Sequence, residues 1–164
     1  MVKSVAVLMG GWSSERDVSL VSGAAVAEAL SEAGYDTETI DVVRDVEALT
    51  RQLTPKPDVV FNALHGPYGE DGCVQGLLEI LDIPYTHSGV LASALAMDKP
   101  MAKKLFTDAG IRCAEHMVAD RDAILSGEVM KPPFVVKPLN EGSSFGVRII
   151  LDEEAVEIAR QEDW

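Results

Sequence analysis

A glycine-rich stretch at residues 65–76 contains the residue types of this chain that most favour chemistry. It has the sequence HGPYGEDGCVQG and directly follows an apolar run at 59–64. Its glycines allow backbone turns with positive φ, so one tight loop can present a histidine, a tyrosine and two carboxylates. Loops at the carboxyl ends of strands bind ligands in α/β proteins. The pattern predicts a binding loop with His65 as its functional residue, although an isolated histidine in a glycine turn more often bonds only to backbone.

A second candidate, GGWSSERDVS at 10–19, leads from a strand-like run into a helix-like one. It is not a dinucleotide fingerprint, because the third glycine is missing and Glu15 would repel a phosphate. A carboxylate at this point suits a substrate ammonium, while the helix N-terminus suits a carboxylate, so together they would hold an amino acid. The alternative is structural: Ser14 or Asp17 caps the helix and Glu15 lies on its first turn.

A third candidate, KPLNEGSSFGV at 137–147, places Lys137 at the end of a strand and a Gly/Ser turn before the next one. Such a turn can fold over phosphates, with lysine as a mobile positive charge. Taken alone the motif is weak, because a Gly/Ser hairpin with a surface lysine is common. Lys99 alone, at the start of a helix, is most simply a solvated residue.

The elements that must position these motifs follow from the hydrophobic pattern. Strand-like runs alternate with runs of helical period, which is typical of parallel βα units. The predicted strands are 2–9, 37–42, 59–64 and a short piece at 84–85, and the predicted helices are 18–33, 46–53 and 73–81. Right-handed crossovers would then give a three-layer arrangement with helices on both faces of the sheet.

The pattern changes around residue 88, where we place the boundary between a domain at 1–88 and a second at 89–164. Helix formers fill 90–109, interrupted at Asp98-Lys99-Pro100, where proline fits the first turn of a new helix. The elements predicted after them are a strand at 114–118, a helix at 122–125, strands at 133–137 and 147–151, and a helix at 152–161. This order is typical of the opening of an α+β domain.

Composition excludes several classes of partner. The net charge of -13 argues against nucleic acid or an anionic membrane, since both require a basic face, whereas local lysines still permit ATP. The apolar N-terminal run is interrupted too early by Gly10 for a signal peptide or a membrane span. Cys73 and Cys113 lack metal-site spacing, so we expect no metal on them and reduced thiols in the cytoplasm.

Four motifs in order, GGWSSERDVS, HGPYGEDGCVQG, SGVLASALAMDK and VVKPLNEGSSFGV, resemble those of the D-alanine:D-alanine ligases of the ATP-grasp superfamily. The resemblance runs from Val5 to about Leu151. It implies an α/β fold: an N-terminal parallel-sheet domain (pre-ATP-grasp, Rossmann-like) that binds substrate, followed by the first part of the α+β ATP-grasp central domain, which binds nucleotide.

The resemblance also implies a reaction. This family joins two D-alanines with ATP and Mg²⁺ through an acyl phosphate, making the dipeptide used in peptidoglycan. The resemblance further implies a homodimer at full length, and with no sign of secretion we expect the enzyme in the cytoplasm.

By resemblance, Glu15 anchors the ammonium of the first D-alanine, with the backbone of Val18 beside it. His65 corresponds to a histidine near the substrate carboxylate. Ser143 corresponds to a serine that hydrogen-bonds to the Glu15 position and orders the active site, so Glu15, His65 and Ser143 form the implied catalytic set.

Lys99 and Lys137 correspond to lysines on the ATP phosphates, and Ser144 to a residue in the loop above them. The family's Mg²⁺ ligands follow the position of Trp164, so no metal ligand is expected within these 164 residues. We therefore expect the chain to be an incomplete part of such an enzyme that does not turn over ATP alone.

Trp12 departs from the family pattern, which usually has a smaller residue there, and Glu15 stays in register. Two alternatives remain open: a ligase that makes a D-alanine depsipeptide such as D-alanyl-D-lactate, or a mixed dipeptide, and a non-catalytic small-molecule binding module.

Overall fold

The structure is a computed structural model that describes residues 3–127, 129–140, 142 and 146–161. It divides into two compact units, Met1–Met97 and Asp98–Trp164. The first unit includes helix α4 (Val90–Met97), which the division at residue 88 assigned to the second domain. This helix packs on the first unit, where the carbonyl of Val90 lies so close to Gly72 that a Cβ there would meet it at 2.7 Å.

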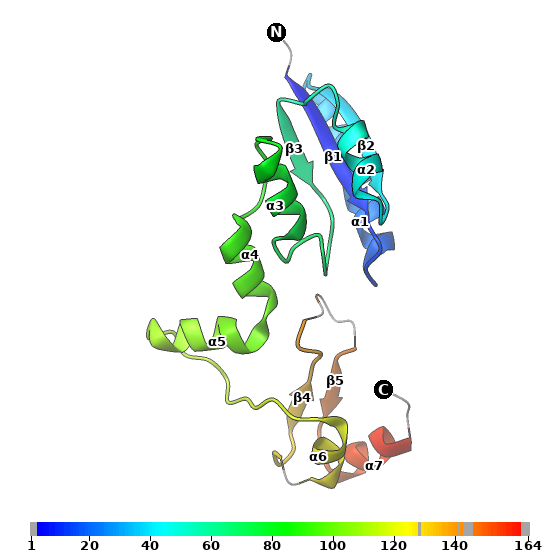
Figure 1. The fold of residues 1–164 in the computed structure, drawn as a ribbon. Helices are drawn as coiled ribbons and strands as arrows, with labels where there is room; N and C mark the ends of the chain where they lie inside the picture. The colour runs from blue at the N-terminus through cyan, green and yellow to red at the C-terminus, as the bar shows by residue number, and fades with distance from the viewer. Residues whose placement is uncertain (1–2, 128, 141, 143–145, 162–164) are drawn as a thin grey trace. The chain divides into compact units, whose positions relative to one another are not determined.

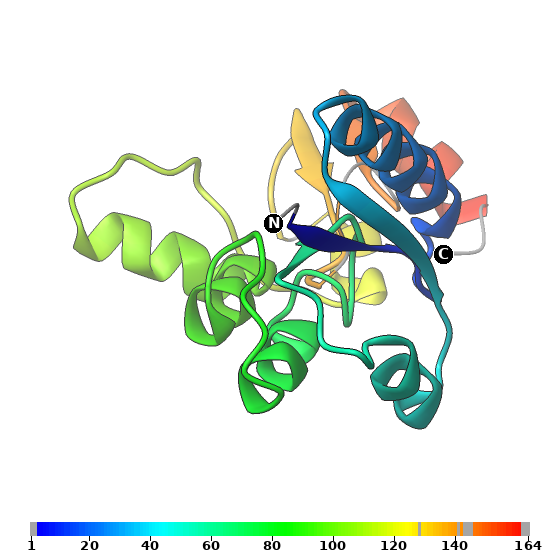
Figure 2. The same ribbon diagram turned by 90° about the horizontal axis from the view of Figure 1, so that it is seen from above.

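The first unit is built on a three-stranded parallel sheet of order β2-β1-β3 (Figure 1). Its strands are β1 (Ser4–Gly10), β2 (Asp36–Val42) and β3 (Val59–Asn62). Its helices besides α4 are α1 (Arg16–Glu32), α2 (Val46–Gln52) and α3 (Cys73–Ile80). The crossovers place α1 on one face of the sheet and α2 and α3 on the other (Figure 2). The predicted three-layer arrangement is therefore confirmed.

Alternation along β1 explains the two layers of core. Val5 and Val7 pack with Leu30 of α1, whereas Ala6 and Leu8 pack with residues of α2 and α3. Both sides of the strand are buried, as a central parallel strand requires. Parallel pairing also brings the carboxyl ends of β1 and β3 together, with Leu8 opposite Asn62.

Two of the predicted strands differ from the structure. The piece at 84–85 contributes only an isolated parallel bridge between Val60 and Tyr85. The strand predicted at 114–118 is wrong, because residues 111–120 have no regular structure and Met117 and Val118 are more than half exposed. A short apolar run becomes a strand only where a partner takes up its backbone hydrogen bonds.

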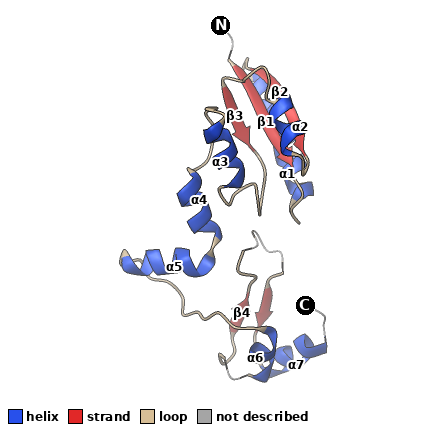
Figure 3. Ribbon diagram, in the orientation of Figure 1, coloured by secondary structure: helices blue, strands red, loops and turns tan. Residues whose placement is uncertain are grey.

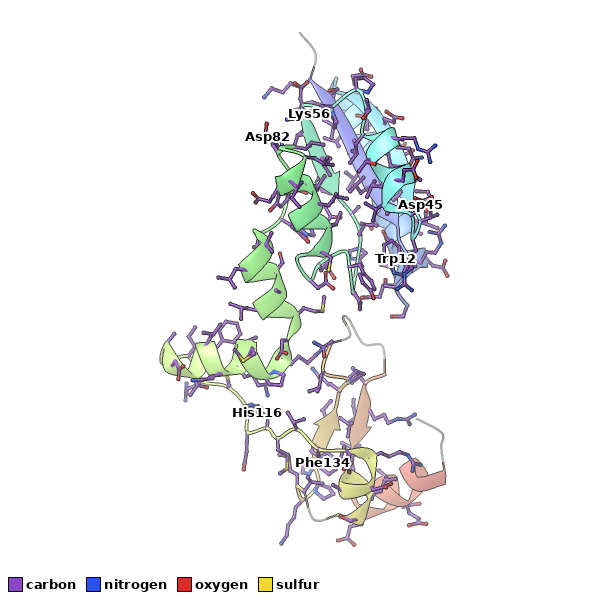
Figure 4. All side chains as sticks on the ribbon, in the orientation of Figure 1. Trp12, Asp45, Lys56, Asp82, His116 and Phe134 are labelled. Carbon is purple, nitrogen blue, oxygen red and sulfur yellow. The ribbon has the colours of Figure 1, made fainter. Side chains whose placement is uncertain are left out.

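The second unit is small (Figure 3). Its elements are α5 (Lys99–Asp108), α6 (Arg121–Ser126), β4 (Phe134–Val136), β5 (Arg148–Ile150) and α7 (Glu153–Gln161). The two strands pair antiparallel, with Val135 opposite Ile149. Leu125 and Ile150 are buried with Phe134, which points toward α6 and α7 (Figure 4). No helix in the described ranges combines the length and the apolar character needed to cross a bilayer.

A buried hydroxyl joins three elements at the carboxyl edge of the first unit's sheet. Ser19, in α1, is fully buried; its Oγ accepts a hydrogen bond from the Gly10 amide at 2.9 Å and donates one to the Ala63 carbonyl at 2.7 Å. Gly10 ends β1, and Ala63 follows β3 directly. This bond pair therefore sets where α1 begins relative to both strands. Trp12 lies at this edge, and Lys56 and Asp82 lie at the opposite one (Figure 4).

Replacing Ser19 with Ala should lower the free energy of unfolding of the first unit by about 1–3 kcal/mol, because a buried amide and a buried carbonyl lose their partner. Urea unfolding followed by circular dichroism measures this. Ser31→Ala, on an exposed position of the same helix, is the matched control and should change stability by less than about 0.5 kcal/mol. Equal effects of the two substitutions would contradict the assigned role of Ser19.

Candidate functional site

Glu15 lies between β1 and α1, and one oxygen of its carboxylate is unpaired among the described residues. It is the N-cap residue of α1, yet its side chain makes no capping hydrogen bond. The residue is only 9% exposed, and Oε2 is buried without a hydrogen-bond partner in the described part of the chain. Asp17 lies within the first turn of the helix, so it does not occupy the cap position. The capping alternative therefore does not describe the Glu15 side chain, whose Oε2 is buried without a donor in the residues that the structure describes.

The glycine-rich loop after β3 is held down by two buried amides. Asn62 Nδ2 and Gln75 Nε2 both donate to the carbonyl of Gly69, at 2.8 and 2.9 Å. Asn62 is 1% exposed and Gln75 is fully buried. These bonds fix the middle of the loop against the end of β3 and the start of α3. Neither residue was predicted from the sequence, although a polar residue inside the apolar run 59–64 was a signal for Asn62.

The structure brings Glu15 and the His65 loop together. Ser13 Oγ donates to the carbonyl of His65 at 2.7 Å and accepts from the amide of Glu15 at 3.2 Å. Gly66 has φ +70°, and a Cβ on it would lie 2.9 Å from Glu15 Oε2. Glycine suits this position because its φ is positive, and the close approach shows that the carboxylate lies against the loop backbone. Two motifs far apart in sequence thus meet at one edge of the sheet.

The ring of His65 contacts side chains on both of its nitrogens. Nε2 lies 3.1 Å from Ser22 Oγ, and Nδ1 lies 3.7 Å from Glu70 Oε1. Ser22 Oγ also donates to the Ser19 carbonyl at 3.2 Å, which ties it to the preceding turn of α1. Glu70 is itself oriented, since its Oε2 accepts from the Gly66 amide at 2.7 Å. The ring is therefore held by α1 and by its own loop, and it does not bond only to backbone.

The position of Ser22 was not found from the sequence. It lies on α1, beyond Val18, and only the docking of the helix on the sheet brings its hydroxyl to His65. Val18 itself lies near the start of α1, with its side chain 58% exposed. The His65 side chain remains 31% exposed, so a ligand can reach the ring.

Arg16 fixes the glycine turn that precedes Glu15. Its guanidinium donates to the Gly11 carbonyl at 2.9 Å and forms a two-point pair with the Asp41 carboxylate at 2.8 and 2.7 Å. The hydrogen bond from Arg16 holds the pKa of Asp41 below its ordinary value, and the same pair raises the pKa of Arg16. The pair links the end of β2 to the entry of α1.

In the second unit, Lys99 is the first residue of α5, and Asp98 caps the helix by accepting from the Met101 amide at 2.9 Å. Lys99 Nζ donates to the Leu139 carbonyl at 3.1 Å, in the loop that follows Lys137. Lys137 is exposed directly after β4. The two lysine-bearing segments therefore meet within this unit. Ser143 and Ser144 lie outside the described residues.

The described residues contain no cluster of three or more histidine, cysteine, aspartate or glutamate side chains that could hold a metal ion. Cys73 and Cys113 are free thiols. Burial raises the pKa of the Cys73 thiol, with a further contribution from Asp71, so this thiol is not an activated nucleophile.

Comparison with known proteins gives the same family as the motifs. Residues 41–88 match the family model described as D-ala D-ala ligase N-terminus. The chain is 60% identical, over 93% of its length, to D-alanine–D-alanine ligase of Rhizobium meliloti (strain 1021), and the match covers 49% of that protein. It therefore spans about half the length of the curated relatives it matches.

Solved structures of D-alanine ligases are also similar to this chain. The ATP complex of D-alanine–D-alanine ligase from Bacillus anthracis has a TM-score of 0.73 and 32% identity, with 98% of this chain and 52% of that chain covered. VanG D-Ala:D-Ser ligase from Enterococcus faecalis has a TM-score of 0.69 and 30% identity, with 99% and 61% covered. The resemblance to D-alanine:D-alanine ligases and the predicted α/β fold class are confirmed.

Asp41→Asn should destabilise the first unit at neutral pH by about 0.2–1 kcal/mol, because both partners of the pair are more than one-third exposed. Since the pKa of Asp41 is lowered in the folded state, its stabilisation is present above the unfolded pKa and is lost as pH falls through the folded one. The stability difference between wild type and variant should therefore shrink below about pH 4.

Urea unfolding at a series of pH values measures this difference. Asp36→Asn, which removes an exposed carboxylate from the same strand, is the control and should show no such pH-dependent gap. A difference in unfolding free energy between wild type and Asp41→Asn that stays constant from neutral to acid pH would rule out the Arg16–Asp41 pair as its source.

Proposed function

We propose that this chain is part of an ATP-dependent ligase that joins two D-alanines into D-alanyl-D-alanine for peptidoglycan synthesis. The observation that carries the proposal is the buried Glu15 carboxylate, whose Oε2 has no donor in the described residues and lies against the His65 loop. The similarity to proteins named D-alanine–D-alanine ligase supports it.

A buried carboxylate oxygen that finds no donor among the described residues is costly, so the site favours a ligand that supplies a cation with N–H donors. The ammonium of an amino acid is such a group. The same ligand carries a carboxylate, and the partly exposed His65 ring lies on the loop that covers Glu15. A small zwitterion such as D-alanine matches both groups at once, with Glu15 at its ammonium, the Val18 backbone beside it and His65 near its carboxylate.

For the nucleotide, we propose that Lys99 and Lys137 bind the ATP phosphates and that Ser144 lies in the loop above them. The Lys99 contact with the loop after Lys137 supports a common site for the two lysines. The Bacillus anthracis relative is described in complex with ATP. We assign Ser143 to ordering the amino-acid site through the Glu15 position.

The described residues do not fit a Mg²⁺ site, because they offer no cluster of carboxylates for it. We propose that Mg²⁺ ligands belong to the part of the ligases that this chain does not span. The enzyme would be a cytoplasmic homodimer. Its net charge of -13 supports a small-molecule partner over nucleic acid or a membrane surface.

In the proposed reaction, ATP phosphorylates the carboxylate of the first D-alanine, and the amine of the second attacks the acyl phosphate. Phosphate then leaves from the tetrahedral intermediate. Positive groups that face the phosphoryl and carbonyl oxygens stabilise the charge that develops there. Glu15 and His65 contribute by orienting the first substrate so that its carboxylate meets the phosphate.

A second candidate differs in the second substrate. The similarity to the D-Ala:D-Ser ligase from Enterococcus faecalis covers 99% of this chain, so the part of the fold present here is shared by ligases with different products. A mixed dipeptide or a D-alanyl-D-lactate product is therefore compatible with the same Glu15 site. A non-catalytic binding module is the third alternative, and it predicts no preference for D-alanine.

Glu15→Gln should weaken D-alanine binding by about tenfold or more, because a hydrogen bond to a charged group contributes about 1.5–3 kcal/mol. NMR titration of the chain with D-alanine, and with L-alanine for selectivity, measures this. Asp17→Asn removes a neighbouring carboxylate of the same helix and is the matched control, which should retain wild-type affinity. Equal weakening by both substitutions, or no preference for D-alanine, would contradict the proposed site.

We expect no phosphate release from ATP when D-alanine is added to these 164 residues alone, because about half the length of the relatives is not spanned. In a longer protein that contains this chain, Glu15→Gln should lower turnover far more than stability. Phosphate release assays and thermal unfolding separate the two effects. A loss of stability with normal turnover would count against the role of Glu15.

A further inference from the structure

The face of the sheet opposite α1 carries a cavity that His65 lines but Glu15 does not. It has a volume of about 300 Å³ and lies between α2 and α3, at the carboxyl edge of the sheet. Its inner wall is formed by buried core residues, including Leu49, Leu64 and Val74. Glu15 and Ser22 do not line it.

We propose that this cavity is a second binding site, for a small aromatic carboxylate. Its volume is at the lower end of the range for small-molecule sites, which are mostly apolar with a few polar groups that fix orientation. The walls are apolar side chains of α2, α3 and the sheet. A single fused or substituted ring with one acid group matches this size and this composition.

The rim supplies aromatic surface. Trp12 and Tyr68 lie with ring centroids 5.1 Å apart at an interplanar angle of 36°, and both line the cavity. They are 38% and 43% exposed, and Val46 beside them is 63% exposed. These large apolar side chains stand around a hollow instead of filling it. An aromatic ligand would bury this surface, and flat rings pack well against Trp and Tyr.

Arg44 supplies a positive charge at the same rim of the cavity. Its Cζ lies 5.9 Å from the centre of the Tyr68 ring, and it makes no ion pair or hydrogen bond within the described ranges. None of the described lining residues is acidic, although the chain has 27 acidic residues against 14 lysines and arginines. A guanidinium that pairs with no carboxylate in the described part of so acidic a protein favours an anionic ligand, which it can meet by two parallel hydrogen bonds.

The cavity also touches the functional loop from its other side. His65, Pro67, Tyr68 and Gly69 contribute to its lining. A ligand in the cavity would therefore contact the glycine-rich loop at 65–76, and this loop also packs against Glu15. This second site goes beyond the proposed ligase function, and its existence does not depend on that function.

The test uses 2-naphthoate as the probe and neutral 2-naphthamide as its matched analogue, titrated into the chain by isothermal calorimetry and ligand-observed NMR. Val46→Trp fills the rim and should weaken binding of both compounds by more than about tenfold, since the ligand loses its buried surface. Val21→Trp, on an exposed position of α1 on the opposite face, should leave affinity within about twofold.

A second pair of variants tests the charge and does not depend on the cavity being filled. Arg44→Gln should weaken 2-naphthoate by about threefold, the size expected for an exposed charge pair, and leave 2-naphthamide unchanged. Arg51→Gln, which removes an exposed arginine from α2, should change neither. Circular dichroism verifies that every variant is folded.

Three outcomes would overturn the proposal: no saturable binding of 2-naphthoate to the wild-type chain, binding that Val46→Trp and Val21→Trp weaken equally, or an equal loss of both probes in Arg44→Gln. A fourth is self-association. Sedimentation that shows a dimer in the wild type, lost in Val46→Trp and kept in Val21→Trp, would mean that a second copy covers this face.

Discussion

The Ser19 hydroxyl is the interaction on which the geometry of the first unit's site depends. It joins the last amide of β1 to the first carbonyl after β3 from within α1. Because the hydroxyl is fully buried, neither backbone group has water as a substitute partner. The start of α1 is thereby fixed relative to both strands. Glu15 comes just before this point and Ser22 just after it, so a single bond pair positions the carboxylate and the hydroxyl that bracket the loop of His65.

The sheet and its helices were predictable because their apolar patterns are long and match the two core layers of the first unit. Each face of β1 has its own apolar set, and α1 and α3 bury stripes that match those sets. The prediction of a strand at 114–118 was wrong for the opposite reason. Of its residues Val118 alone has marked strand propensity, no neighbouring strand in the described part of the chain pairs with it, and Met117 and Val118 remain exposed. Strand propensity is a property of one segment, whereas a β-strand forms only when a second segment pairs with it.

The candidate site was predictable only where residues stand in a dense polar motif. Glu15 and His65 were proposed because glycines and further polar residues surround them in the sequence, although each residue alone has a common structural role. Ser22 and Gln75 were not found, since a serine and a glutamine on helices look ordinary until tertiary packing places them. Each contacts the glycine-rich loop at 65–76 through its side chain, and no local sequence pattern predicts that contact. Contacts that hold a functional residue are in general harder to predict than that residue.

The composition of the loop explains how one segment can serve both faces of the sheet. Gly66 and Gly69 bring the backbone against its neighbours, because a Cβ would lie 2.9 Å from Glu15 Oε2 in the first case and 2.6 Å from the Leu64 side chain in the second. The loop is consequently thin, with the carboxylate on one side and Pro67 and Tyr68 at the rim of the cavity on the other. A bulkier loop would separate these two surfaces. Close backbone packing therefore makes the polar site and the apolar cavity two sides of one structural element.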